Sequence, residues 1–202
     1  MSIVEFTNRL NMVQSLYLSN TKIQKNGTKL VGTFPKGALL ARHYIFAPMP
    51  VHIQKELIDS YMRKFPEELL ALYESANGFA MFFVERKIGK FSIGHCQLTV
   101  YGLPVEFTRD VERLQPFNIR NEDLNRPDGT PDNWLKFGSY EILNPSDEEH
   151  IPMCYLFVDI DDHRVYSVVS QSESCKVVNQ WESIDNCLCE LFDRISAHYN
   201  LI

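Results

Sequence analysis

The first part of the chain has the pattern of a helix followed by a hairpin. Apolar residues recur every three or four positions, as in an amphipathic helix, at Ile3, Phe6, Leu10, Val13 and Tyr17. Ser2 and Glu5 have the spacing of a capping box that would begin this helix. Asn26-Gly27 is typical of a two-residue hairpin turn, and pairing around it predicts Ile23 opposite Leu30. We therefore expect residues 1–50 to form an N-terminal extension, a helix and a hairpin, packed on a main domain of residues 51–202.

Two further helices are predicted before the spacing of apolar residues changes from that of a helix to that of a strand. The first covers residues 51–63, with an apolar stripe at Ile53, Leu57 and Tyr61. The second begins at Pro66, whose missing N–H is harmless in a first turn, and its apolar face consists of Leu69, Leu72, Tyr73 and Ala76. Glu67 and Glu68 lie at its positive dipole end, and Gly78 can adopt the left-handed conformation that ends a helix.

After Gly78 the pattern becomes that of strands. Residues 80–84 and 154–160 are typical of buried strands, and shorter extended segments are predicted at residues 91–93, 97–101, 134–140 and 165–169. The segment from Asn125 to Asn133 is rich in Pro, Asp and Gly and predicts a loop. Ser183 is expected to cap a closing helix with apolar residues at Ile184, Leu188, Leu191, Ile195 and Tyr199. The elements predict an α+β fold in which a mostly antiparallel sheet packs against helices.

The composition is that of a globular protein, with 45% hydrophobic and 23% charged residues. No apolar run approaches the roughly 20 residues of a membrane span, and the N-terminus lacks the pattern of a signal peptide. The five cysteines are odd in number and lack CxxC spacing, as is typical of reduced thiols. We therefore expect a cytoplasmic protein that does not bind membranes.

The acidic residues are unevenly distributed along the chain. Residues 141–202 contain twelve acidic and three basic residues, a net charge of -9, whereas residues 1–140 have a net charge of +3. Nucleic acid is a poor partner for such an acidic region, because phosphates require a basic surface. A basic protein is a suitable partner, because opposite charges speed and orient association.

One acidic cluster could bind a metal. Asp159, Asp161 and Asp162 follow a predicted strand, and such carboxylates can hold a hard cation such as Mg²⁺. The alternative is a turn, in which Asp side chains cap nearby backbone N–H groups. No other segment offers a matching third or fourth ligand, so we expect no metal and no other cofactor.

Other catalytic patterns are incomplete. His52 and Glu56 share a helix face but lack the second His of a zinc site. Residues 32–37 resemble the opening of a phosphate loop, without its Lys and Ser or Thr. Cys187 and Cys189 point apart on a helix, so they cannot form a redox pair. We therefore predict no catalytic residues.

A partner-binding surface is predicted from aromatic and acidic residues near loops. Trp134 either closes the edge of a core or anchors a partner, since interface energy concentrates in aromatic residues. Asp147, Glu148 and Glu149 either form a solvated loop or, with Asp161 and Asp162, create a field that attracts a basic partner.

Residues 65–78, FPEELLALYESANG, resemble the helix and Asn-Gly turn of the SUKH superfamily. The order of the predicted elements after residue 78 is also similar to that of the superfamily. It consists of an extended segment ending in Phe137-Gly138-Ser139, a hairpin from Phe157-Val158-Asp159 into Val165-Tyr166, and a helix after Trp181-Glu182-Ser183. The resemblance covers residues 51–197. Residues 1–50 and the loop at Asn125–Asn133 depart from the compact form of the family.

The resemblance implies a protein without enzymatic activity. Bacterial members of the superfamily are immunity proteins that neutralise toxins of polymorphic toxin systems, and fungal members regulate cell-wall synthesis. The leading hypothesis is therefore an immunity protein with a basic toxin as its partner. The alternatives are a regulatory scaffold of the fungal type and a metal-dependent hydrolase that uses Asp159, Asp161 and Asp162.

Overall fold

A nine-stranded antiparallel sheet forms the centre of the fold, and its strands lie in chain order. The computed structural model describes residues 3–34, 41–59, 65–88, 91–103, 126–141, 153–169 and 174–198. The strands are β1 (Thr21–Ile23), β2 (Lys29–Thr33), β3 (Ala41–Ile45), β4 (Phe79–Ile88), β5 (Phe91–Val100), β6 (Trp134–Glu141), β7 (Met153–Asp159), β8 (Val165–Val169) and β9 (Val177–Trp181). The helices are α1 (Val4–Leu16), the short 3₁₀ helix η1 (Leu18–Asn20), α2 (Val51–Asp59), α3 (Glu67–Ser75) and α4 (Ile184–His198). This architecture confirms the predicted α+β class.

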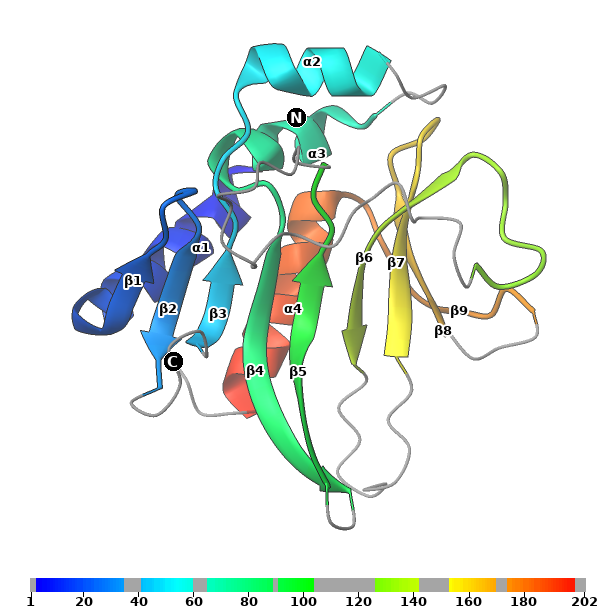
Figure 1. Cartoon of the computed structure of the whole chain (residues 1–202). Helices are drawn as coiled ribbons and strands as arrows, with labels where there is room; N and C mark the ends of the chain where they lie inside the picture. Colours follow the sequence, from blue (N-terminus) through cyan, green and yellow to red (C-terminus); the bar gives the residue numbers. More distant parts are fainter. Residues whose placement is uncertain are drawn as a thin grey trace.

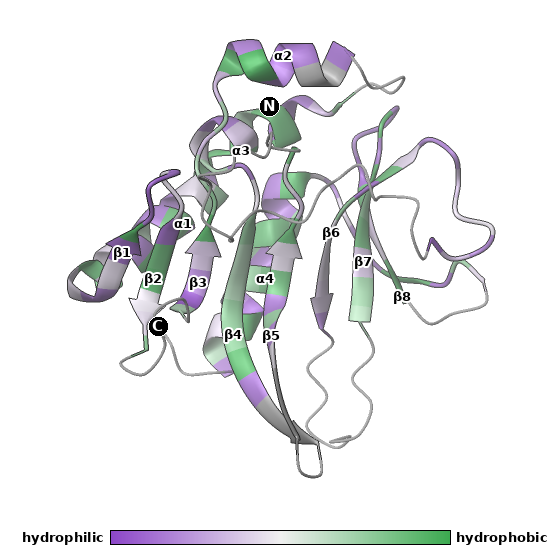
Figure 2. Ribbon diagram, viewed as in Figure 1, coloured by the Kyte–Doolittle hydropathy of each residue, from purple (hydrophilic) through white to green (hydrophobic). Residues whose placement is uncertain are grey.

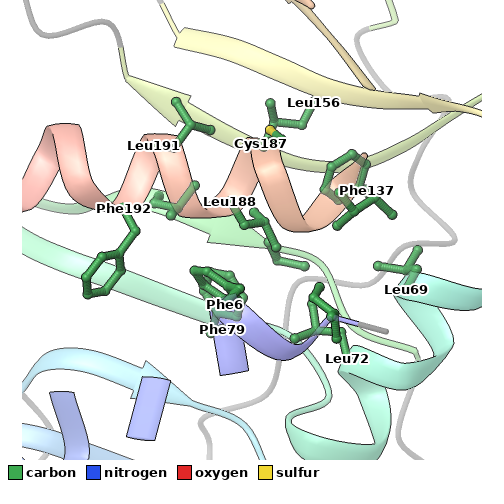
Figure 3. Close-up of a cluster of buried hydrophobic side chains, with 14 of the residues drawn as sticks. Phe6, Leu69, Leu72, Phe79, Phe137, Leu156, Cys187, Leu188, Leu191 and Phe192 are labelled. Carbon is green, nitrogen blue, oxygen red and sulfur yellow. The ribbon is translucent and has the colours of Figure 1, made fainter. Parts of the chain in front are cut away.

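The main core lies between the sheet and the helices α1 and α4, which run behind the sheet in Figure 1. Aromatic rings join the three elements: the Phe6 ring of α1 lies 5.1 Å from Phe79 of β4 and 6.2 Å from Phe192 of α4. Figure 3 shows these rings with Leu188 of α4 and Leu72 of α3 in one cluster. The helices therefore cover a single face of the sheet together.

The helix α1 begins differently from the predicted capping box. Its N-cap residue is Ile3, which makes no side-chain cap hydrogen bond, and Ser2 lies outside the described residues. The carboxylate of Asp185, at the start of α4, takes this role: the Phe6 N–H donates to its Oδ1 at 2.9 Å and the Glu5 N–H to its Oδ2 at 3.4 Å. Tertiary packing has thus replaced the local cap, and Arg9 pairs with Asp193 at 2.7 Å between the same helices.

The predicted hairpin exists, but its register was wrong by one residue. Lys22 lies opposite Leu30, and Ile23 lies opposite Lys29. The connection is longer than two residues, because the Gln24 N–H donates to the Thr28 carbonyl at 2.9 Å around a turn that contains Gly27. The strands β1, β2 and β3 continue the sheet of the later strands rather than forming a separate one.

The predicted buried stripe of α2 was wrong at Ile53, the member whose side chain the structure describes. The described helix is Val51–Asp59, and Ile53 is 38% exposed. The buried residue is Gln54, whose side-chain amide donates to the Met49 carbonyl at 2.8 Å. The Leu57 side chain and Tyr61 lie outside the described residues. Figure 2 shows hydrophobic and hydrophilic residues mixed along α2, which lies above the end of the sheet.

The helix α3 buries the predicted face, and Leu69, Leu72, Tyr73 and Ala76 are fully buried. Pro66 is its N-cap rather than its first helical residue. The helix ends at Ser75, so Gly78 is not its immediate cap: Ala76 is already extended with φ -157°. Gly78 has the expected positive φ of 82°. This conformation turns the chain into β4 and does not end the helix.

Two predictions at the C-terminal end were confirmed. The strands β7 and β8 flank a turn, as expected, and Ser183 caps α4, because the Asn186 N–H donates to its Oγ at 3.1 Å. The extended segments predicted at 91–93 and 97–101 belong to one continuous strand, β5.

Among the helices that the structure describes, none has the length and apolar character required to cross a membrane.

Candidate functional site

A cleft of about 290 Å³ opens where the beginnings of α3 and α4 meet the turn between β7 and β8. Its described lining residues are mostly acidic or polar: Phe65, Glu67, Glu68, Asp162, His163, Glu182 and Ser183. Four of these seven are carboxylates, and none of the seven is Lys or Arg. We call this feature the acidic cleft.

Glu68 is the most buried carboxylate of the acidic cleft, with 9% of its surface exposed. Its Oε2 accepts a hydrogen bond of 2.8 Å from the N–H of Ile184, the first residue of α4. The positive end of the α4 dipole therefore stabilises the carboxylate. Within the described part of the chain, no Lys or Arg forms an ion pair with Glu68.

The turn between β7 and β8 forms one wall of the cleft. His163 adopts a positive φ of 65°, and its N–H donates to the Asp159 carbonyl at 2.9 Å. Asp159 accepts hydrogen bonds from the Asp161 N–H at 2.9 Å and from Asn133 Nδ2 at 2.9 Å. Asp162 accepts one from the Arg164 N–H at 2.9 Å. These carboxylates stabilise the backbone of the turn, as the turn interpretation of the sequence predicts.

An arginine lies beside the acidic cleft without closing it. Arg164 Nε is 3.8 Å from Asp162 Oδ2 and 3.9 Å from Glu182 Oε2. The three side chains are 48%, 46% and 81% exposed, so water screens these long ion pairs and they contribute little to stability. Asp162 and Glu182 therefore remain accessible to a second cation.

The structure brings only part of the predicted partner surface to this site. Asp162 lines the acidic cleft, and Asp161 lies in the same turn with its Oδ2 2.9 Å from Asn133 Nδ2. Asp147, Glu148 and Glu149 lie outside the described residues. Trp134 belongs to a small core cluster: it is 8% exposed and stacks on Tyr166 with ring centroids 4.2 Å apart. Its indole N–H donates to Asp159 Oδ2 at 3.2 Å, which fits the core-closing interpretation.

Sequence reasoning missed Glu67, Glu68 and Glu182 as site residues. The dipole argument at the start of α3 identified a favourable place for the first two carboxylates, but it gave no indication that α4 and the β7–β8 turn lie beside them. Glu182 follows β9 directly and has no distinguishing local pattern.

A second polar cluster, also missed, lies on β5 and β6. His95 Nε2 is 2.8 Å from Glu141 Oε1, and the Gln97 amide nitrogen is 2.7 Å from Glu141 Oε2 and 2.9 Å from His95 Nε2. Their strand neighbours Leu98 and Tyr140 pack in the main core, so alternation places this cluster on the opposite face of the sheet. The Gln97 Oε1 atom is buried without a hydrogen-bond partner.

Three of the five cysteines, Cys96, Cys187 and Cys189, have little chemical reactivity. Burial raises the pKa of the Cys187 thiol well above its usual range, and it raises the pKa values of Cys96 and Cys189 to about 12. These thiols stay protonated and weakly nucleophilic at neutral pH. His52 and Glu56 are exposed on α2. In the described segments, no three or more His, Cys, Asp or Glu side chains are grouped so as to hold a metal ion.

Comparison with known proteins found no matching family model, curated protein or solved structure.

Proposed function

We propose that this chain is a non-enzymatic binding protein that neutralises a basic toxin of a polymorphic toxin system, using the acidic cleft as the centre of its binding surface. The observation that carries the proposal is the concentration of four carboxylates in a concave site without Lys or Arg among its described lining residues. The resemblance of residues 65–78 to the SUKH superfamily supports the same function.

Electrostatics explains how such a surface would act. Three of the four cleft carboxylates, Glu67, Asp162 and Glu182, are exposed. Asp162 and Glu182 belong to the region with a net charge of -9. A concave surface of one sign concentrates the field, which accelerates the approach of a basic partner and orients it. Binding should therefore weaken as the salt concentration rises, because ions screen exposed charges beyond about 10 Å at 0.1 M.

The hydrogen bonds of the turn favour binding over hydrolysis. A metal-dependent hydrolase would use the oxygens of Asp159, Asp161 and Asp162 as ligands. Asp159 Oδ1 already accepts from Asn133 and from the Asp161 N–H, and Asp162 Oδ1 accepts from the Arg164 N–H. A metal would have to compete with these bonds, which hold the turn together.

The proposal is tested by protection of cells. The chain is coexpressed with each toxic domain encoded beside its gene, and growth is compared with that of cells expressing the toxin alone. We expect protection by the parent and loss of protection when Glu67, Asp162 and Glu182 are changed together to Gln, Asn and Gln. A triple variant that folds and protects as well as the parent contradicts the acidic site, and failure against every neighbouring toxin contradicts the immunity function.

A second candidate function is a regulatory scaffold for an endogenous kinase or cell-wall factor. Three exposed apolar side chains within eight residues of the chain favour it: Leu16, Leu18 and Ile23 are 56%, 80% and 69% exposed. Exposed apolar side chains that form a contiguous patch are typical of a protein interface. A scaffold would lose its partner when Leu18 and Ile23 are changed to Ser, whereas the proposed toxin complex should persist.

A further inference from the structure

We infer that the acidic cleft binds the guanidinium group of an arginine side chain of the partner. The inference rests on the proposed function and names the chemical group that the site recognises. Three features of the cleft support the inference: a buried negative charge, a cavity of suitable size, and two outer carboxylates that one guanidinium can reach together.

The buried charge is that of Glu68. Its Oε2 is held by the Ile184 N–H at 2.8 Å, whereas its Oε1 has no hydrogen-bond partner among the described residues. The α4 dipole favours this charge, but a carboxylate that is 9% exposed has lost most of its hydration, and no Lys or Arg of the described residues forms an ion pair with it. A cation that enters the cleft from outside would stabilise the charge further.

The dimensions of the cleft fit a long side chain. A cavity of about 150 Å³ can hold benzene, and the acidic cleft is larger, about 290 Å³. A bare metal ion would leave most of this space empty. Phe65, which also packs in the main core, is the apolar member of the described lining.

The outer carboxylates have the spacing of a guanidinium site. The chain's own Arg164 lies within 4 Å of both Asp162 and Glu182, at 3.8 and 3.9 Å, so one guanidinium can contact both. Arginine offers five donors in a planar fork, whereas lysine offers a compact ammonium that is more strongly hydrated. Several carboxylates around one cavity therefore favour arginine over lysine. Arg164 would compete with the incoming group for the same oxygens.

The test uses a small probe and the full chain. Nα-acetyl-arginine amide is titrated into the protein and followed by calorimetry, beside the citrulline amide, a neutral molecule of nearly the same shape, and the lysine amide. We expect the arginine probe to bind most tightly and the citrulline probe not to bind. Glu68→Gln should weaken the arginine probe about tenfold or more, because a charged hydrogen bond is lost while the Ile184 N–H keeps its acceptor.

Three variants complete the design. Asp162→Asn should also weaken binding of the arginine probe. Arg164→Ala should strengthen its binding, because a competing cation is removed. Glu74→Gln is the matched control, because Glu74 is exposed on α3, the helix of Glu68, but does not belong to the described cleft lining. It should leave binding of the probe unchanged. Equal binding of citrulline, equal binding of lysine, or unchanged binding in both Glu68→Gln and Asp162→Asn would overturn the inference.

The outcome is distinguishable from that of the proposed function. If the arginine probe binds as described but no neighbouring toxin is neutralised, the cleft is an arginine site and the toxin function fails. If the chain neutralises a toxin equally well with Glu68→Gln, and the probe does not bind, the toxin function stands and the arginine inference fails.

Discussion

Replacing Gly78 by alanine should destabilise the protein by about 2–5 kcal/mol. Two separate costs contribute to this value. Gly78 has φ 82°, a conformation that costs an L-residue about 1–2 kcal/mol. A Cβ at this position would also lie 2.6 Å from the Val100 carbonyl oxygen and 2.9 Å from the Gly102 nitrogen. Both are backbone atoms, so the chain must shift, which typically costs about 1–3 kcal/mol.

Two other glycines separate these costs. Gly129 has φ 77°, but a Cβ there would meet nothing within 4 Å, so Gly129→Ala reports the backbone term alone. Gly138 would place a Cβ 2.5 Å from the Thr99 carbonyl oxygen without a positive φ, so Gly138→Ala reports the steric term alone. Urea denaturation followed by tryptophan fluorescence gives the free energy of unfolding of each variant. We expect Gly78→Ala to exceed Gly129→Ala by the cost of the clash.

Equal losses for Gly78→Ala and Gly129→Ala would refute the close approach of residue 78 to β5. A Gly78→Ala variant as stable as the parent would refute its positive φ as well.

Further predictions concern buried groups. Burial lowers the pKa of His43 to about 3, and its neutral Nδ1 accepts the Phe82 N–H at 3.4 Å. The unfolded chain therefore binds the proton more readily, so the free energy of unfolding should be fully retained above pH 6.5 and fall as the pH drops toward 3. Thermal melts from pH 7 to 4 should show a smaller decline for His43→Asn, and an identical decline contradicts a neutral His43. Asp185→Ala should cost about 1 kcal/mol and increase hydrogen exchange in α1, whereas Asp185→Asn should cost less; unchanged exchange would show that the carboxylate does not cap α1.

The sequence predicted those elements whose burial follows a single period. In α3 and α4 the apolar residues recur along one face because each helix packs against the same core throughout its length. In α2 the pattern failed at Ile53, which is exposed, whereas the polar Gln54 is buried and donates a hydrogen bond to the Met49 carbonyl. Periodicity predicts a buried face, and it cannot reveal that a helix buries a polar residue instead.

The register of β1 and the start of α1 depended on contacts that local sequence does not contain. Lys22 and Ile23 are both exposed, so burial does not decide which of them lies opposite Leu30. The cap of α1 comes from Asp185, which is about 180 residues away along the chain. A capping box is only one way to satisfy the free N–H groups at the start of a helix, and in α1 a carboxylate from a neighbouring helix accepts two of them.

The position of the acidic cleft does not follow from the net charge of either part of the chain. Asp162, which lines the cleft, belongs to the acidic residues 141–202, but Glu67 and Glu68 belong to residues 1–140, whose net charge is +3. The fold brings acids from both regions to one place, while Lys and Arg of the first region do not line the cleft in the described residues. Net charge along the chain therefore does not reveal where the fold gathers charges of one sign.

The role of Glu68 can be resolved by comparing two substitutions in the absence of any partner. Glu68→Gln retains an acceptor for the Ile184 N–H and loses both the attraction of the helix dipole and the cost of a buried charge, so its stability should stay within about 1 kcal/mol of the parent. Glu68→Ala leaves that N–H without its acceptor and should cost about 1–3 kcal/mol. Urea denaturation of both variants, with Glu74→Gln as control, measures the difference. If Gln is as damaging as Ala, the charge is needed for folding, and the argument for a cation from outside loses its basis. If Gln is tolerated, the carboxylate is retained for a purpose that the free protein does not reveal, and the arginine probe should then stabilise the parent but not the Gln variant, because a ligand raises stability only where it binds.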